Sequence, residues 1–141
     1  MNILFLDVDG VLNNYISEGS FSEFNLLNLK ELCSRIEFKI VLSSDWRRTD
    51  KAKNIVKHKL KEFDLRISSC TPVKLSLDDR KDEIRMWLND NEWSKALIID
   101  DMSKKACDPE MENVTFFRIN YKLGLTAEDV DKICELFSES T

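Results

Sequence analysis

Five short apolar runs alternate along the chain with segments in which apolar residues recur every three or four positions. The runs predict strands over residues 3–8, 38–42, 65–69, 96–99 and 114–119. The first two are almost continuously apolar, which is typical of strands buried on both faces of a sheet. Alternating strands and helices indicate a parallel sheet with helices on both faces. The sequence therefore predicts a three-layer α/β fold around a mostly parallel central sheet.

The helical spacing predicts four helices, over residues 22–35, 52–63, 82–90 and from 126 onward. The last begins at Thr126-Ala127-Glu128-Asp129, which resembles a capping box, a reciprocal pair of hydrogen bonds that starts a helix. No repeat or Pro/Gly-rich linker divides the chain, and its 141 residues suit one domain of ordinary size. We therefore expect residues 1–141 to form a single domain.

The composition excludes several classes of protein. No run of 18 apolar residues is present, so a transmembrane helix is not expected, and no basic segment precedes the first apolar run, which argues against a signal peptide. The four cysteines lie far apart, so we expect reduced thiols and no zinc site. The single histidine, His58, lies among lysines with no catalytic partner nearby. These features predict a cytoplasmic protein.

Positive charge is concentrated in one part of this acidic chain. Residues 46–62 carry seven Lys or Arg against two acidic residues, a local charge of +5. Because the net charge of the chain is −5, the remaining residues carry −10. A basic stretch of this kind can bind phosphates or nucleic acid. Taken alone, however, it is more often a solvated helix face.

Acidic and hydroxyl side chains follow three of the predicted strands. They are Asp7 and Asp9 at the end of the first strand, Ser43 and Ser44 after the second, and Asp100 and Asp101 after the fourth. The carboxyl ends of parallel strands share one edge of a sheet, where ligands bind. Carboxylates at that edge are costly unless they are paired or bound to a metal.

A magnesium ion resolves the repulsion between such carboxylates. Mg²⁺ prefers oxygen ligands, and Asp7, the backbone carbonyl of Asp9, and one or both of Asp100 and Asp101 make a suitable set. An ion that keeps open positions suits a phosphate substrate. A carboxylate beside it can attack phosphorus and form an aspartyl-phosphate.

Four motifs resemble, in the right order, those of the haloacid dehalogenase (HAD) superfamily. They are Asp7-Val8-Asp9-Gly10-Val11-Leu12, Ser43-Ser44, the pair Arg80-Lys81 that heads a helix, and Ile98-Ile99-Asp100-Asp101. The first motif is the most specific. The resemblance implies a Rossmann-like HAD fold and phosphoryl-transfer chemistry.

A wider pattern resembles the small HAD domains of "Swiss army knife" RNA-repair proteins across nearly the whole chain. It comprises Asn13, Leu42-Ser43-Ser44-Asp45-Trp46-Arg47, Thr71-Pro72, Arg80-x-x-Glu83-Ile84-x-x-Trp87-Leu88 and Gly124-Leu125-Thr126. HAD phosphatases often carry a cap domain, but residues 13–22 and the ten or so residues before Arg80 are too few for one. We expect a capless site, or one with only a small flap, and an open site suits a bulky phosphate.

The resemblance implies a role for each aspartate of the motifs. Asp7 would be the nucleophile and a metal ligand. Asp9 would protonate the leaving oxygen and then activate water. Asp101 would complete the Mg²⁺ shell, with Asp100 binding directly or through water.

The resemblance also implies phosphoryl-binding residues. Ser43, with Ser44 as the lesser candidate, would hydrogen-bond the phosphoryl group, and either Arg80 or Lys81 would neutralise its charge. Electrostatic positioning of this kind is what phosphoryl transfer chiefly requires.

Trp46 and the basic stretch follow the second motif and suggest the substrate. Trp46 could stack on a base, and the stretch from Arg47 to Lys61 could hold a nucleic-acid backbone. The leading hypothesis is a Mg²⁺-dependent phosphatase that acts on the 3′- or 5′-phosphate of nucleic-acid ends, or on nucleotides. The alternatives are a small-metabolite phosphatase and a weakly catalytic module that binds phosphorylated partners. The sequence indicates no membrane association and gives no oligomeric state.

Overall fold

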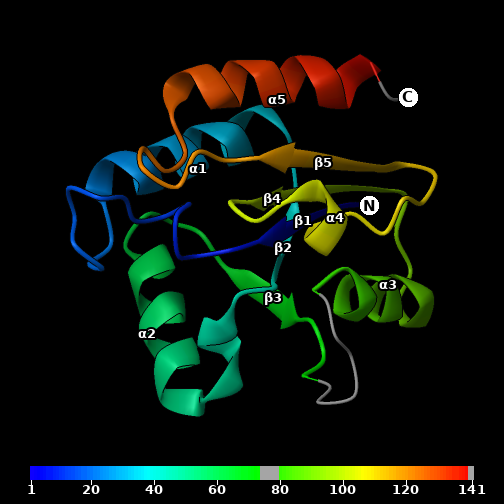
Figure 1. Ribbon diagram of the computed structural model, residues 1–141, viewed down its shortest axis with the longest axis horizontal. Coiled ribbons are helices and arrows are strands. Elements are labelled where there is room, and N and C mark those ends of the chain that lie inside the picture. The colour runs from blue at the N-terminus through cyan, green and yellow to red at the C-terminus, as the bar shows by residue number, and fades with distance from the viewer. Residues whose placement is uncertain (74–79, 140–141) are drawn as a thin grey trace.

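The computed structural model describes residues 1–73 and 80–139 (Figure 1). Its strands are β1 (Asn2–Leu6), β2 (Lys39–Leu42), β3 (Ile67–Cys70), β4 (Lys95–Asp100) and β5 (Val114–Arg118). Its helices are α1 (Glu23–Arg35), the 3₁₀ helix η1 (Asp45–Arg48), α2 (Asp50–Lys61), α3 (Arg80–Asp90), α4 (Lys104–Cys107) and α5 (Ala127–Glu139). Each predicted strand and helix is present, with bounds that differ by at most two residues.

The five strands form one sheet in the order β3-β2-β1-β4-β5, and every neighbouring pair is parallel. In Figure 1 the strands follow this order from β3 in the lower part of the view to β5 in the upper part. The predicted α/β fold is confirmed, and the sheet is parallel throughout rather than mostly parallel.

Side chains alternate between the two faces of β1 and fill two cores. Leu4 and Leu6 join a core with the apolar residues of α1, α2 and α5, whereas Ile3 and Phe5 pack with those of α3 and α4. This period of two, on a strand buried on both faces, is why its sequence reads as an unbroken apolar run. The sheet is therefore the middle layer of three.

The chain changes direction across the sheet between β1 and β4. From β1 it adds β2 and β3 on one side, then crosses to place β4 and β5 on the other. At such a switch point the loops after the two central strands diverge and leave a crevice. Leu6 is paired with Ile99, so the residues that follow β1 and β4 emerge side by side.

Two one-turn helices, η1 and α4, are absent from the sequence predictions. Each is capped by a serine, Ser44 before η1 and Ser103 before α4, whose hydroxyl accepts a backbone N–H. A helix of four residues is too short to show an apolar period. Within the described residues, no helix is both long and apolar enough to cross a membrane.

Candidate active site

Three aspartates meet where β1 and β4 end. One carboxylate oxygen from each of Asp7, Asp100 and Asp101 lies within 4.8 Å of the others. The backbone N–H of Asp7 donates to the carbonyl of Ile99 at 3.3 Å, which extends the strand pairing to the cluster. Asp7 is 3% exposed and Asp100 is fully buried. The parallel topology thus brings together carboxylates that are more than 90 positions apart in the sequence.

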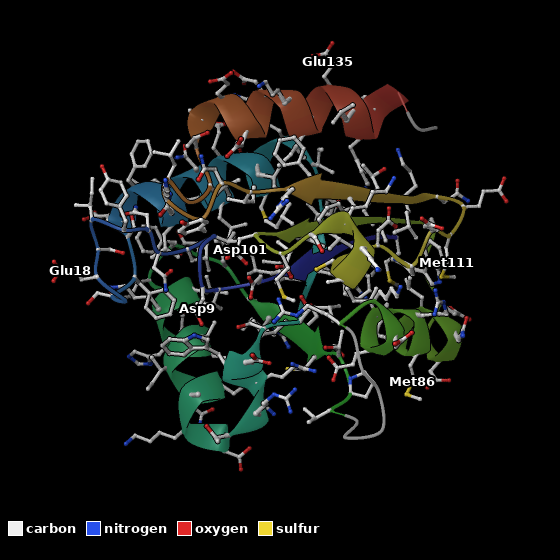
Figure 2. The ribbon with its side chains drawn as sticks, in the orientation of Figure 1. Asp9, Glu18, Met86, Asp101, Met111 and Glu135 are labelled. Atoms are coloured by element: carbon white, nitrogen blue, oxygen red, sulfur yellow. The ribbon has the colours of Figure 1, made fainter. Side chains whose placement is uncertain are left out.

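Gly10 lets the chain turn tightly beneath this cluster. Its φ of +78° is disfavoured for residues with a side chain, and a Cβ at this position would lie 2.4 Å from Asp101 Oδ2. The glycine therefore serves both the turn and the close approach of Asp101. Figure 2 shows Asp101 and Asp9 on the same side of the molecule, by the carboxyl ends of the strands.

Arg80, the first residue of α3, reaches into the aspartate cluster. Its Nη1 lies 3.2 Å from Asp7 Oδ1 and 2.5 Å from Asp100 Oδ2. Lys81 instead lines a separate depression with Lys104 and Lys105, over α3 and α4. Of the two cations that the sequence left open, the structure brings Arg80 to the aspartates.

Crowding alters the ionisation of these groups. Burial raises the pKa of Asp7 well above its ordinary value, and the charge of Asp100 raises it further, while Arg80 opposes part of the shift. Burial also raises the pKa of Asp101. Burial would lower the pKa of Arg80, but attraction to Asp7 and Asp100 raises it above its ordinary range. The carboxylates repel one another more than one guanidinium can offset.

The donor set fits a hard divalent cation. All its candidate ligand atoms are carboxylate oxygens, which Mg²⁺ prefers. A bound ion would favour the charged carboxylates and so counteract the burial and the repulsion from Asp100 that raise the pKa values of Asp7 and Asp101. Asp7, Asp100 and Asp101 are the residues that would hold it. The Asp9 carboxylate is exposed and is not part of this group. Binding of the ion by the backbone carbonyl of Asp9 stays a prediction.

Ser43 and Ser44, just after β2, differ in their hydrogen bonding. The Ser43 hydroxyl is fully buried and has no hydrogen-bond partner among the described residues. The Ser44 hydroxyl accepts the backbone N–H of Trp46 at 3.2 Å and caps η1. Buried hydroxyls are almost always satisfied, so the Ser43 hydroxyl is an exception among the described residues and is able to donate to a bound group.

Asp9 is held by two side chains on the exposed side of the site. The indole Nε1 of Trp46 donates to its carboxylate at 3.1 and 3.2 Å, and Asn13 Nδ2 donates at 3.0 Å. Trp46 also packs against Phe21, with ring centroids 5.4 Å apart. The polar edge of Trp46 thus orients Asp9, and the stacking of its ring on a base stays a prediction. Asn13 belongs to the family pattern, but the sequence carries no signal of its contact with Asp9.

Arg47 is not presented to a ligand, contrary to the expectation that it binds substrate. Its guanidinium is buried and donates to the backbone carbonyls of Ser44, Thr71 and Pro72 at 2.9–3.1 Å. Its Nη2 also lies 2.6 Å from the buried carboxylate of Glu83. Arg47 therefore ties together the segments that follow β2 and β3. The basic surface of α2 consists of its lysines instead, of which Lys51, Lys57 and Lys61 are exposed.

Asn25 of α1 joins the loops that border the site on the other side. Its Nδ2 donates to the carbonyls of Leu123 and Leu125 at 3.0 and 2.8 Å, and its Oδ1 accepts from Asn14 at 2.9 Å. Gly124 makes room for it, because a Cβ there would lie 2.4 Å from Asn25 Oδ1. The sequence signal was an asparagine one position before Leu26, on the apolar side of the predicted helix.

The loop over residues 13–22 contains neither helix nor strand, as expected for a small flap. Its ends are held together by the Ser22 N–H, which donates to the Leu12 carbonyl at 2.8 Å. The other possible cap position, between β3 and α3, includes residues 74–79, which lie outside the described residues. Residues 13–22 therefore form no cap domain.

Comparison with known proteins places the chain in one family. The model of the HAD domain in Swiss Army Knife RNA repair proteins matches residues 3–130, which span β1 to the start of α5. No curated protein and no solved structure gives a significant match. The match includes each of the motif residues described above, and HAD domains are generally phosphatase-type hydrolases that use Mg²⁺. The chain therefore belongs to the family of HAD domains found in Swiss Army Knife RNA repair proteins.

Proposed function

We propose that this protein is a Mg²⁺-dependent phosphatase that removes a terminal phosphate from nucleic acid through an aspartyl-phosphate on Asp7. The observation that carries the proposal is the buried Asp7 carboxylate, in contact with Arg80 and grouped with two further carboxylates. Charge of this density at the switch point of a parallel sheet is costly to maintain, and phosphoryl transfer is a chemistry that uses it.

The residues divide the reaction into two displacements. In the first, an Asp7 carboxylate oxygen attacks phosphorus, the ester P–O bond breaks, and the Asp9 carboxyl gives its proton to the leaving oxygen. In the second, water attacks the same phosphorus and gives a proton to Asp9, and the P–O bond to Asp7 breaks. Inorganic phosphate leaves and both aspartates return to their starting states.

The surrounding groups support this assignment. The unpartnered Ser43 hydroxyl is suited to donate to a phosphoryl oxygen, and Arg80 is suited to offset the charge on the phosphoryl group. Trp46 and Asn13 fix the Asp9 carboxylate by hydrogen bonds, which keeps the proton donor in a constant position. Bound Mg²⁺ would polarise the phosphoryl oxygens and offset the repulsion among the carboxylates.

Two observations favour a nucleic-acid substrate over a small ester. The family is named for RNA repair. Exposed lysines of α2 follow the second motif. A depression of about 310 Å³ lies over α3 and α4, close in sequence to Arg80 and Asp101, and its lining holds four basic residues, Lys81, Arg85, Lys104 and Lys105, against two acidic ones, Asp108 and Glu110. Basic surfaces beside a phosphate site suit a substrate that carries several phosphates.

Release of inorganic phosphate, measured with Mg²⁺, tests the proposal. The substrates are 3′- and 5′-phosphorylated oligonucleotides, mononucleotides and sugar phosphates. Asp7→Asn is expected to abolish turnover. Asp50→Asn is the matched control, because Asp50 is an almost fully exposed aspartate of α2. Absence of turnover on every substrate, with wild type equal to Asp7→Asn, would exclude the enzyme.

The same assay distinguishes the alternatives. Turnover of oligonucleotides that falls steeply with salt, while turnover of small esters does not, would support the nucleic-acid substrate. Preference for a sugar phosphate would support a small-metabolite phosphatase. Tight binding of phosphorylated oligonucleotide without turnover would indicate a binding module.

A further inference from the structure

A second pocket opens directly beside the aspartate cluster. It has a volume of about 350 Å³ and is lined by Asp101, Arg118, Ile119, Asn120 and Tyr121. Asp101 belongs both to this pocket and to the carboxylate group, so the two spaces adjoin. The other lining residues come from the end of β5 and the loop after it.

Two hydrogen bonds join the residues that line this pocket to the end of β4. The Ile119 N–H donates to the Asp100 carbonyl at 2.8 Å, and Arg118 Nε donates to the Asp101 carbonyl at 3.1 Å. A third bond, from the Tyr15 N–H to the Lys122 carbonyl at 3.3 Å, joins the loop after β5 to the flap. The backbone around the pocket is thus hydrogen-bonded to the backbone of Asp100 and Asp101.

The side chains of the pocket offer a cation, an aromatic face and an amide. Arg118 uses only Nε in its bond to Asp101, and its two terminal nitrogens have no partner within residues 1–73 and 80–139. Tyr121 is 57% exposed, so its ring is accessible to a ligand. The side-chain Oδ1 of Asn120 accepts from the Lys122 N–H at 3.0 Å, which leaves its side-chain NH₂ group to donate. A guanidinium, a ring and an amide are the groups that bind a phosphodiester and a base.

The other side of the site, formed by the residues after β2, does not offer an accessible guanidinium together with an accessible aromatic ring. The Trp46 ring there packs on Phe21 and donates to Asp9, so it is already committed to the protein. The Arg47 guanidinium is buried. Recognition of a neighbouring nucleotide therefore falls on the β5 side.

We propose that this pocket, the β5 subsite, binds the nucleotide next to the phosphorylated end. Arg118 pairs with the internucleotide phosphate, Tyr121 stacks on the base, and the terminal phosphate is placed at Asp7. This inference rests on the proposed function and specifies its substrate as a chain of at least two nucleotides. At about 350 Å³ the pocket lies near the lower end of ligand-site volumes, so it suits one nucleotide unit rather than several.

Steady-state kinetics on matched substrates test the β5 subsite. Phosphorylated mono-, di- and trinucleotides of both polarities are compared with p-nitrophenyl phosphate, in the presence of Mg²⁺. For wild type, kcat/KM is expected to rise about ten-fold or more from mononucleotide to dinucleotide and to change little with the third unit. Arg118→Ala and Tyr121→Ala are each expected to remove most of that gain, measured as the ratio of kcat/KM for the dinucleotide to kcat/KM for p-nitrophenyl phosphate. Tyr121→Phe is expected to keep it, because a phenyl ring stacks as well.

Lys122→Ala is the matched control, since Lys122 lies in the same loop but does not line the pocket. If Arg118→Ala and Tyr121→Ala behave like Lys122→Ala on the dinucleotide, the subsite is refuted while the phosphatase stands. Binding of a fluorescent phosphorylated dinucleotide to the Asp7→Asn protein gives a second readout that needs no turnover. Dissociation constants that rise when Arg118→Ala or Tyr121→Ala is added to Asp7→Asn support the subsite, and dissociation constants that stay equal overturn it. Failure of wild type to release phosphate from any substrate refutes the proposed function instead.

Discussion

Replacement of Ser43 by alanine should stabilise the fold and impair its chemistry. The hydroxyl is completely buried and has no partner among the described residues. An unsatisfied buried hydroxyl costs about 1–3 kcal/mol, and its removal leaves only a small void, so we expect a net stabilisation of about 1 kcal/mol. The neighbouring Ser44 is the matched control. Its hydroxyl caps η1, so Ser44→Ala should destabilise by about 1 kcal/mol.

The two adjacent substitutions should therefore differ by about 2 kcal/mol in the free energy of unfolding, with opposite signs. Denaturant unfolding followed by tryptophan fluorescence and circular dichroism measures this difference. In the phosphatase assay, Ser43→Ala loses a hydrogen bond to a charged group, worth about 1.5–3 kcal/mol, so kcat/KM should fall about ten- to hundred-fold. Destabilisation by Ser43→Ala as large as that by Ser44→Ala would refute the reasoning, because it would mean that the hydroxyl already has a partner in the unliganded protein.

Three further predictions concern charge. The folded pKa values of Asp7 and Asp101 are raised, so the unliganded fold loses stability as the pH rises from the ordinary pKa of 3.8 through the raised values. The increase in Tm that Mg²⁺ causes should therefore grow between pH 5 and pH 8. An increase in Tm that does not depend on pH would contradict this. Arg47→Met removes the guanidinium that lies 2.6 Å from the buried Glu83 carboxylate and should lower the free energy of unfolding by about 3–5 kcal/mol, whereas exposed Arg48→Ala should change it by less than about 1 kcal/mol; similar losses in chemical denaturation would argue against the buried ion pair. Asp9→Asn should retain a burst of about one p-nitrophenolate per enzyme, since that leaving group needs little protonation, while the steady-state rate falls about 10²–10⁴-fold; stopped-flow absorbance measures both, and equal slowing of both phases would argue against Asp9 as the base of the second step.

The fold was predictable because the sheet is buried on both faces. The central strands β1, β2 and β4 then read as apolar runs. The alternation of strands and helical segments allows few arrangements other than a parallel sheet. The register of the strand ends was less accessible. The first apolar run continues to Val8, yet β1 ends at Leu6 because the turn at Gly10 takes the chain out of the sheet.

The meeting of Asp7 with the late aspartate pair followed from topology, since parallel strands end at the same edge. The choice between Arg80 and Lys81 did not, because successive helical residues point about 100° apart and the rotation of α3 about its axis is set by packing. Arg47 looked like part of a basic surface because its partner, Glu83, lies in a different helix. Local charge patterns carry no information about such distant pairs.

The side-chain amide of Asn25 in α1 stabilises the loops that border the site. It forms hydrogen bonds with the loop after β5 and, through Asn14, with the flap, and none of these bonds involves a catalytic carboxylate. Exposed residues at the loop tips, such as Tyr15 and Tyr121, can therefore be exchanged while the chemistry beneath them keeps its geometry. A scaffold arranged in this way lends itself to redesign, in which new molecular preferences are grafted onto an unchanged hydrolytic centre.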